Sequence, residues 1–402
     1  MLATTPSTLR PDRVPTADDA FALADDLAAR FAATAVDRDR LGGTALVERD
    51  LLRASGLLRA SIPIELGGWG LAWPEVLAIV RRFARVDGSL AHLFGFHHLL
   101  LATVRLFGSA AQTERWLGDT AARPWFWGNA LNPRDQRTRL GRDADGWRLR
   151  GTKSFCSGAR DADVLVVSAL RDGDGALAVA VVPAGRSGIT IRDDWDSFGQ
   201  RQTDSGTVEL DEVAVLDDEL LRTPGPLGSV RATLRPLLAQ LILVNVYLGL
   251  GEGALADARG HALSAARARA AAGPAAPIDD PYVLHHVGTM WVELEGARRL
   301  ADVAGAGFEA AWRQGDDLAA RQRGEAAIAI ATAKVAATRA GLDVATRLFD
   351  TVGARATSGR AGLDRYWRNL RTHTLHDPVD HKLRELGAWA LHDEPPTPSF
   401  YS

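Results

Sequence analysis

The spacing of apolar residues changes twice along this chain of 402 residues, and this change constrains the fold more than any other feature. Apolar residues recur every three to four positions over residues 17–120, which predicts helices. Between about 124 and 220 the period becomes two, which predicts strands. From 226 to 392 the helical spacing returns, in segments rich in Ala, Leu, Arg and Glu. The order of helices, strands and helices indicates an α+β fold.

Three units are expected from these changes of period: an N-terminal helical domain, a central barrel-like β-domain, and a C-terminal helical bundle with a tail. We place them at residues 1–123, 124–225 and 226–402. Strands are expected at 147–150, 164–169, 177–182 and 207–210. A helical bundle beside a small sheet leaves a junction where cofactors commonly bind, so we expect the site there.

Composition excludes several classes of protein. The net charge of −3, without any basic block, gives no footprint for nucleic acid. The single cysteine, Cys156, excludes an intrachain disulfide and a multi-cysteine metal site. The N-terminus lacks the basic and apolar regions of a secretory signal. The most apolar stretch, 234–250, is interrupted by polar residues and is expected to be a buried helix rather than a membrane span, so a cytoplasmic protein is expected.

Histidines are the main candidates for chemistry, because the chain has no Gly-x-Gly-x-x-Gly, Walker or Gly-x-Ser-x-Gly motif. His373 and His376 are three residues apart and share a face if helical. No full set of metal ligands accompanies them, so general acid–base work is favoured over metal binding, with surface or capping roles as the alternative. His97 lies in an apolar helical segment, where a core histidine with satisfied ring nitrogens is the alternative to a functional one.

The segments 151–163 and 195–206, with several others, resemble the reduced-flavin-dependent monooxygenase branch of the acyl-CoA dehydrogenase superfamily, typified by dibenzothiophene monooxygenase. The resemblance covers the chain from about residue 20 to its tail. The matching segments are 65–70, 87–90, 93–97, 128–130, 151–153, 155–159, 193–195, 201–206, 239–242, 245–249, 280–282, 367–369 and 371–378.

Two departures from the parent dehydrogenases support this branch. The dehydrogenases carry a glutamate base in a Tyr-Glu-Gly-Thr segment, and here the corresponding stretch 374–378 places His376 near that position. Their FAD-binding loop Gln-x-x-Gly-Gly-x-Gly corresponds to 350–356, which keeps one glycine. Side chains in place of glycine block a close approach of the backbone to a phosphate or sugar, so FMN is favoured over FAD.

The resemblance implies a two-component enzyme. A separate NAD(P)H:flavin reductase supplies FMNH2, which reacts with O2 to a flavin C4a-hydroperoxide. The terminal oxygen is transferred to an organosulfur heterocycle similar to dibenzothiophene, giving a sulfoxide or sulfone. The resemblance also implies a homotetramer. An acyl-CoA dehydrogenase that uses FAD and Asp377 as its base is the first alternative, and a non-catalytic flavin-binding protein is the second.

The same resemblance implies roles for individual residues. His97, Ser157 and His376 surround the reactive edge of the flavin, with His373 supporting them; His376 stabilises or protonates the hydroperoxide and His97 is its partner. The isoalloxazine is held by Asn129, Phe155, Ser157 and Trp195. Arg269, or alternatively Arg267, binds the FMN phosphate.

Two segments leave questions open. The loop 131–137 departs from the dibenzothiophene enzyme near the expected substrate entrance. The substrate could therefore be dibenzothiophene, benzothiophene, an alkyl sulfone or a nitrogen heterocycle. The Pro-rich tail 394–402 cannot be helical, and its Phe400 and Tyr401 leave open whether it covers the site.

Overall fold

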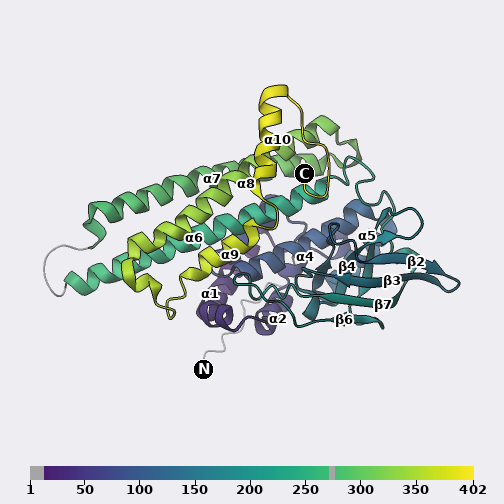
Figure 1. Cartoon of the computed structure of the whole chain (residues 1–402), viewed down its shortest axis with the longest axis horizontal. Coiled ribbons are helices and arrows are strands. Elements are labelled where there is room, and N and C mark those ends of the chain that lie inside the picture. The colour runs from purple at the N-terminus through teal and green to yellow at the C-terminus, as the bar shows by residue number, and fades with distance from the viewer. Residues whose placement is uncertain (1–12, 271–276) are drawn as a thin grey trace.

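The computed structural model describes residues 13–270 and 277–402, without the side chains of 265–270 and 277. Helices precede and follow a single mixed sheet, which lies at one end of a long helical bundle (Figure 1). This arrangement confirms the predicted α+β class. The domain limits at 123 and 225 stay predictions.

The N-terminal helices are positioned by capped starts. Thr16 precedes the first helix and accepts a hydrogen bond from the Asp19 N–H at 3.4 Å, while the Asp19 carboxylate accepts one from the Thr16 N–H at 2.8 Å. Asp87 starts the most buried helix by accepting from the Leu90 N–H at 2.9 Å. These helices are α1 (Ala17–Leu41), α2 (Leu46–Ser55), α3 (Trp73–Ala84), α4 (Gly88–Phe107) and α5 (Ala110–Ala122).

The sheet is built around β4, which pairs in parallel with β1 and antiparallel with β5. The strand order is β1-β4-β2-β3-β7-β6, with β5 beside β4. The strands are β1 (Trp127–Ala130), β2 (Arg139–Asp143), β3 (Gly146–Lys153), β4 (Val164–Arg171), β5 (Leu177–Pro183), β6 (Ile189–Ile191) and β7 (Val208–Val215). Strand β1 packs against α4, so this edge of the sheet meets the helical part of the molecule.

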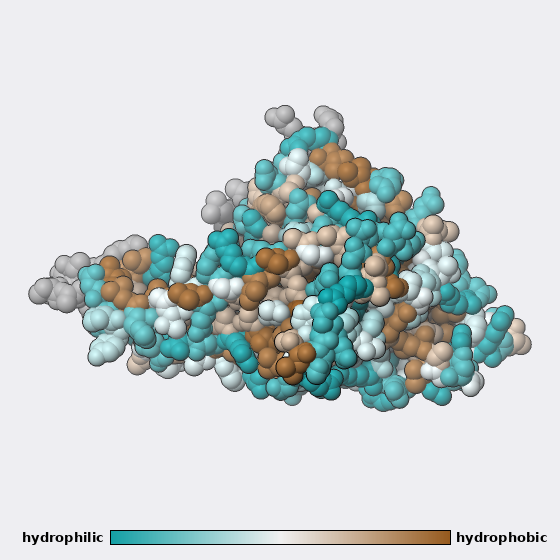
Figure 2. Space-filling model, turned by 90° about the horizontal axis from the view of Figure 1, so that it is seen from above, coloured by the Kyte–Doolittle hydropathy of each residue, from teal (hydrophilic) through white to brown (hydrophobic). Residues whose placement is uncertain are grey.

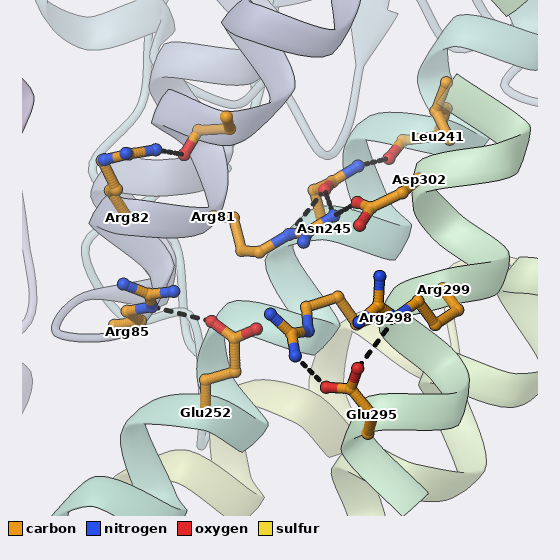
Figure 3. Close-up of polar contacts among 11 residues, drawn as sticks. Arg81, Arg82, Arg85, Leu241, Asn245, Glu252, Glu295, Arg298, Arg299 and Asp302 are labelled. Atoms are coloured by element: carbon orange, nitrogen blue, oxygen red, sulfur yellow. Dashed lines mark hydrogen bonds and ion pairs between the residues drawn. The ribbon is translucent and has the colours of Figure 1, made fainter. Parts of the chain in front are cut away.

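The C-terminal helices form the bundle. They are α6 (Leu234–Ala270), α7 (Pro281–Arg313), α8 (Ala320–Val352), α9 (Asp364–Thr374) and α10 (Val379–His392). Polar contacts join α3 to this bundle (Figure 3). Arg81 donates to Asn245 Oδ1 from Nε at 3.0 Å and from Nη2 at 2.7 Å, and forms an ion pair with Asp302 at 2.9 Å. One arginine thus fixes α3 to both α6 and α7.

Two helices of the described chain are long and apolar enough to cross a membrane, but both are core helices. In Gly88–Phe107 94% of the most apolar window is buried within the protein, and in Leu234–Ser264 89% is. Burial against other helices accounts for their apolar character. The prediction of a buried helix over 234–250 is confirmed.

The C-terminal tail returns to the body of the protein. Arg321 on α8 forms a two-pronged ion pair with Asp393, at 2.8 and 3.0 Å. Arg323 Nη2 donates to the Ser402 carbonyl at 2.5 Å, and Lys382 on α10 donates to the Tyr401 carbonyl. Phe400 packs against the main hydrophobic core. The tail is therefore held against the protein beside α8 and α10 (Figure 1).

Candidate active site

Two buried histidines from distant parts of the sequence meet inside the protein. His92 on α4 is 5% exposed and His373 on α9 is 7% exposed, and their ring centroids lie 4.7 Å apart. Phe96, one helical turn after His92, packs against it with ring centroids 4.0 Å apart. The face of α4 that carries His92 and Phe96 therefore faces α9.

Ring nitrogens of this pair have no hydrogen-bond partner among the described residues. Both nitrogens of His92 are buried and unpaired, and so is Nδ1 of His373. Burial lowers the pKa of His92 to about 3, and the nearby His376 lowers it further. Burial also places the pKa of His373 well below 6.5, with His92 as the next cause. Both rings are neutral at pH 7, and unpaired buried polar atoms of this kind need a ligand or another explanation.

His376 extends the pair toward solvent. Its backbone N–H donates to the His373 carbonyl at 3.0 Å, directly after α9 ends. More than a third of the residue is accessible to solvent, yet dense protein around the ring and the charge of Lys334 lower its pKa. His376 combines a neutral ring with access to a bound molecule, as general acid–base work requires.

A buried polar network lies behind the histidines. Lys334 on α8 is fully buried and donates to Gln240 Oε1 at 2.5 Å, and Gln240 Nε2 donates to Asp377 Oδ2 at 2.9 Å. Burial lowers the pKa of Lys334 to about 8. Tyr247 donates its hydroxyl proton to the His373 carbonyl at 3.0 Å. Because Asp377 and the His373 carbonyl flank His376 in the chain, this network fixes the backbone that carries it.

The residues predicted to hold the isoalloxazine gather at the edge of the sheet. The Asn129 N–H donates to the Ser157 carbonyl at 2.9 Å, and the hydroxyls of Ser157 and Ser205 lie 2.8 Å apart. Phe155 is 61% exposed and meets the Trp195 ring edge-on at 6.0 Å. Exposed aromatic faces beside short polar side chains suit a flat, partly polar ring system.

We call the group of Asn129, Phe155, Ser157 and Trp195 the candidate flavin wall. The backbone in and near this wall is unusual. Phe155 adopts a positive φ of 59°, and so do Gln200 (53°) and Asp204 (51°). They are three of the six such non-glycine residues in the described parts of the chain. The Cys156 N–H donates to the Gly206 carbonyl at 3.0 Å, which ties the two segments together. Strained positions of this kind persist where the surrounding structure holds them, and they are frequent at functional sites.

Hydrogen bonds connect the wall to the histidines. Trp195 Nε1 donates to the Gln200 carbonyl at 2.9 Å. The Gln200 N–H donates to Asn369 Oδ1 at 2.6 Å, and Asn369 precedes His373 by one turn of α9. The candidate flavin wall and the histidine cluster therefore belong to one continuous assembly.

His97 lies apart from the pair of His92 and His373, and its role beside the flavin stays a prediction. Its Nε2–H donates to the Leu58 carbonyl at 2.8 Å, and its Nδ1 accepts from the Trp127 N–H at 3.3 Å. Burial lowers its pKa to about 4. Five residues after His92, it lies on another face of α4, where it joins the helix to β1. Sequence reasoning did not single out His92, and its spacing of four from Phe96 was the available signal.

The phosphate-binding candidates cannot be placed. Arg269 and the alternative Arg267 are in α6, but their side chains lie outside the described residues. Within residues 13–270 and 277–402, no group of three His, Cys, Asp or Glu side chains has a geometry that could hold a metal ion. FMN fits the observed groups, because aromatic faces line the wall and unpaired ring nitrogens are available nearby.

Comparison with known proteins places this arrangement in a family. The chain matches the acyl-CoA dehydrogenase N-terminal domain over residues 19–123, the middle domain over 129–213 and the C-terminal domain over 241–381.

Relatives within the family carry monooxygenase names. The chain is 52% identical to the probable FMNH2-dependent monooxygenase SfnC of Pseudomonas putida, over 95% of this chain and 97% of that one. It is 41% identical to the dibenzothiophene monooxygenase of Mycolicibacterium goodii, over 96% of each.

Solved structures agree. Methanesulfinate monooxygenase MsuC from Pseudomonas fluorescens is 53% identical with a TM-score of 0.91, over 94% of this chain and 98% of that one. TdsC from Paenibacillus sp. A11-2, solved with FMN and indole, is 41% identical with a TM-score of 0.89 and the same coverage.

Proposed function

The chain belongs to the acyl-CoA dehydrogenase family as a monooxygenase that uses reduced FMN, and we propose that it oxygenates an organosulfur compound. The observation that carries the proposal is the group of neutral histidines, His92, His373 and His376, beside the candidate flavin wall. The relatives named for organosulfur substrates support the choice of substrate class.

The alternative of an acyl-CoA dehydrogenase needs a carboxylate that can reach a substrate. Asp377, the candidate base, is 1% exposed, and its Oδ2 accepts from Gln240. A carboxylate held this way supports the backbone rather than meeting a substrate. The monooxygenase function is therefore favoured.

Reduced FMN, when bound, would activate O2 so that one of its oxygen atoms can be transferred. We propose that His376 donates a hydrogen bond or proton at its accessible ring edge and that His92 orients the reacting oxygen. Neutral rings suit this work, because each can donate from one nitrogen and accept at the other. Because His92 and His373 are buried, their rings would exclude water from the space in which the oxygen is transferred.

A separate flavin reductase is proposed as the source of FMNH2. The sequence carries no Rossmann or P-loop motif that would bind NAD(P)H, so the chain itself offers no recognised site for the electron donor. This proposal keeps the two-component organisation expected from the sequence.

The test combines cofactor binding with product analysis. Purified protein is expected to bind FMN in preference to FAD, and with a reductase, NADH and ¹⁸O₂ to place ¹⁸O in an organosulfur product. Methanesulfinate and dibenzothiophene are the two substrates to compare, with the reductase alone as the control. Tight FAD binding together with reduction of that flavin by an acyl-CoA would refute the proposal.

We also propose that the enzyme is a homotetramer. Helix α7 leaves several large apolar side chains exposed, and apolar residues appear on the arm at the left of Figure 2, where α6, α7 and α8 extend from the body. They are Tyr282 (77% exposed), Leu284 (57%), Trp291 (61%), Val292 (70%) and Val303 (67%). Exposed apolar surfaces of this kind favour contact with other subunits, and a second copy of the chain would cover them.

Replacing Trp291 with aspartate is expected to convert the tetramer into smaller species, because a charge at the centre of an apolar interface is costly to bury. Light scattering during size-exclusion chromatography measures the mass. Arg299→Asp, an exposed change on the same helix, is the control and keeps the assembly. A wild-type monomer, or an assembly unchanged by Trp291→Asp, contradicts the prediction.

A further inference from the structure

Three buried hydroxyl groups form a hydrogen-bonded chain that starts at the candidate flavin wall. Ser157 Oγ, in the wall, lies 2.8 Å from Ser205 Oγ. The Ser205 hydroxyl donates to Thr203 Oγ1 at 2.8 Å, and the Thr203 hydroxyl donates to the Gln200 carbonyl at 2.9 Å. All three side chains are buried, with exposed fractions of 8% for Ser157, 6% for Ser205 and 1% for Thr203. We call these three hydroxyls the hydroxyl relay.

The last acceptor of the hydroxyl relay decides the direction of every proton in it. A carbonyl oxygen only accepts, so the proton of Thr203 points to Gln200. Each hydroxyl has a single proton, so Thr203 Oγ1 accepts from Ser205, and Ser205 Oγ accepts from Ser157 in turn. Ser157 therefore donates its proton into the protein. Only the lone pairs of Ser157 Oγ remain for a bound molecule, which makes this wall residue a hydrogen-bond acceptor.

Backbone and ring contacts hold the relay against the wall. The backbone N–H of Gly158, next to Ser157, donates to the Thr203 carbonyl at 2.9 Å. The Gln200 carbonyl that ends the relay also accepts from Trp195 Nε1 at 2.9 Å, so the relay and the wall share one acceptor. Both ends of the relay are therefore attached to the candidate flavin wall.

A buried arginine holds the same segment from the helical side. Arg38, at the end of α1, is 8% exposed, and its Nη1 donates to Gln202 Oε1 at 2.8 Å. The same nitrogen forms an ion pair with Asp87, the residue that caps α4, at 2.5 Å. The backbone N–H of Gln202 donates to Ser89 Oγ at 3.3 Å. The residue before Thr203 is thus fixed by two helices, and hydroxyls fixed in this way lose little freedom when a ligand binds.

An acceptor at Ser157 distinguishes the two redox states of a flavin. Reduction adds an N–H to the central ring of the isoalloxazine, where the oxidised ring has a nitrogen that only accepts. The N–H can donate to Ser157, whereas the oxidised nitrogen would leave two acceptors facing each other without a proton. Among the residues that the structure describes, Ser205 is the one hydrogen-bond partner of Ser157 Oγ. Its remaining lone pairs are therefore available to such a donor.

We propose that Thr203 and Ser205 are positioning residues, which fix the hydroxyl of Ser157 as an acceptor for the ring N–H of reduced FMN. The site then binds FMNH2 more tightly than FMN. This inference rests on the proposed function and deepens it, because it assigns the choice of redox state to three side chains. For a chain that takes up FMNH2 from a separate reductase, the preference favours uptake of the reduced form and release of the oxidised one.

Anaerobic titrations of the protein with FMN and with FMNH2, followed by tryptophan fluorescence, test the relay without oxygen or substrate. The wild type is expected to bind FMNH2 about tenfold more tightly. Thr203→Val keeps the shape of the side chain and removes the last hydroxyl, so it is expected to reduce this preference about three- to tenfold, the effect of one hydrogen bond. A tenfold reduction lowers the midpoint potential of the bound flavin by about 30 mV.

Two variants separate the hydroxyl from the packing of the side chain. Thr203→Ser restores the hydroxyl and is expected to restore the preference for FMNH2. Thr103→Val is the matched control, because Thr103 is fully buried and donates to the Leu99 carbonyl at 2.8 Å, about three turns of α4 after His92. It is expected to leave the preference unchanged.

Equal affinity of the wild type for FMN and FMNH2, or an unchanged preference in folded Thr203→Val, would overturn the inference. A preference that Thr203→Ser fails to restore would also overturn it, since the loss would then come from packing. If Thr203→Val does not fold, Ser205→Ala replaces it, with the same loss expected and the same result decisive. Tight FAD binding and reduction by an acyl-CoA would refute the proposed function instead. Titrations with FAD and reduced FAD, which share the ring, would then decide the relay.

Discussion

Replacing His376 with alanine is expected to lower product formation by roughly 10²- to 10⁴-fold, the contribution typical of a positioned acid or base, while FMN binding is largely retained. The ring is partly accessible, and its surroundings lower its pKa, so it is neutral at pH 7 and offers a donor to the reacting oxygen. Oxygenated product and flavin reoxidation are measured in the same reaction. We expect reoxidation to continue without oxygen transfer.

Substitutions of two further histidines distinguish a role in oxygen transfer from a role in stability. His92→Ala is expected to lower product formation by a similar factor with little loss of stability, because its ring nitrogens have no partner to lose among the described residues. His97→Ala is expected to destabilise the protein by about 2–4 kcal/mol, because it removes two buried hydrogen bonds and leaves a cavity. Urea unfolding and product formation together separate the two roles.

The prediction has a clear contrary result. If His376→Ala retained wild-type product formation, the proposed donor role would be wrong. If His97→Ala stayed fully stable but lost oxygen transfer, the roles of His92 and His97 would have to be exchanged.

The apo-protein is expected to lose most of its stability as the pH falls from about 6.5 to 4.5. Burial lowers the folded-state pKa of His92 to about 3 and of His97 to about 4, and those of His98 and His373 also fall well below 6.5. Between the folded and unfolded pKa values the unfolded chain binds more protons, so stability decreases as the pH falls. Each histidine contributes about 1.4 kcal/mol per pH unit to the free energy of unfolding, and four together contribute roughly 5.6 kcal/mol per pH unit.

This dependence of the free energy of unfolding on pH is large, because the free energy of unfolding of a folded protein totals about 5–15 kcal/mol. Unfolding is therefore expected near pH 5. Urea titrations between pH 7 and pH 5 measure it. His98→Phe, in a folded variant, is expected to reduce the slope by about one proton. His261→Gln and His392→Gln, changes at exposed histidines, are the controls. A stability that is flat from pH 7 to pH 4.5 would contradict the neutral, buried state of these rings.

Periodicity and motif spacing were sufficient to predict the fold. The switch from a period of three to four to a period of two located the sheet, and the strands expected at 164–169 and 177–182 lie within β4 and β5. The segments 151–163 and 195–206 led to the wall that Phe155 and Trp195 form. These features depend on local sequence, because hydrophobic patterning and turns act over a few residues.

By itself, then, the sequence determined the α+β architecture and the family. Which histidines meet was decided only by the packing of α4 against α9, because positions of one helix such as His92 and His97 face different neighbours. The return of the tail to place Tyr401 beneath Arg134 is likewise a tertiary result. It depends on ion pairs such as Arg321–Asp393, between residues 72 positions apart, and no local pattern encodes a contact of that span.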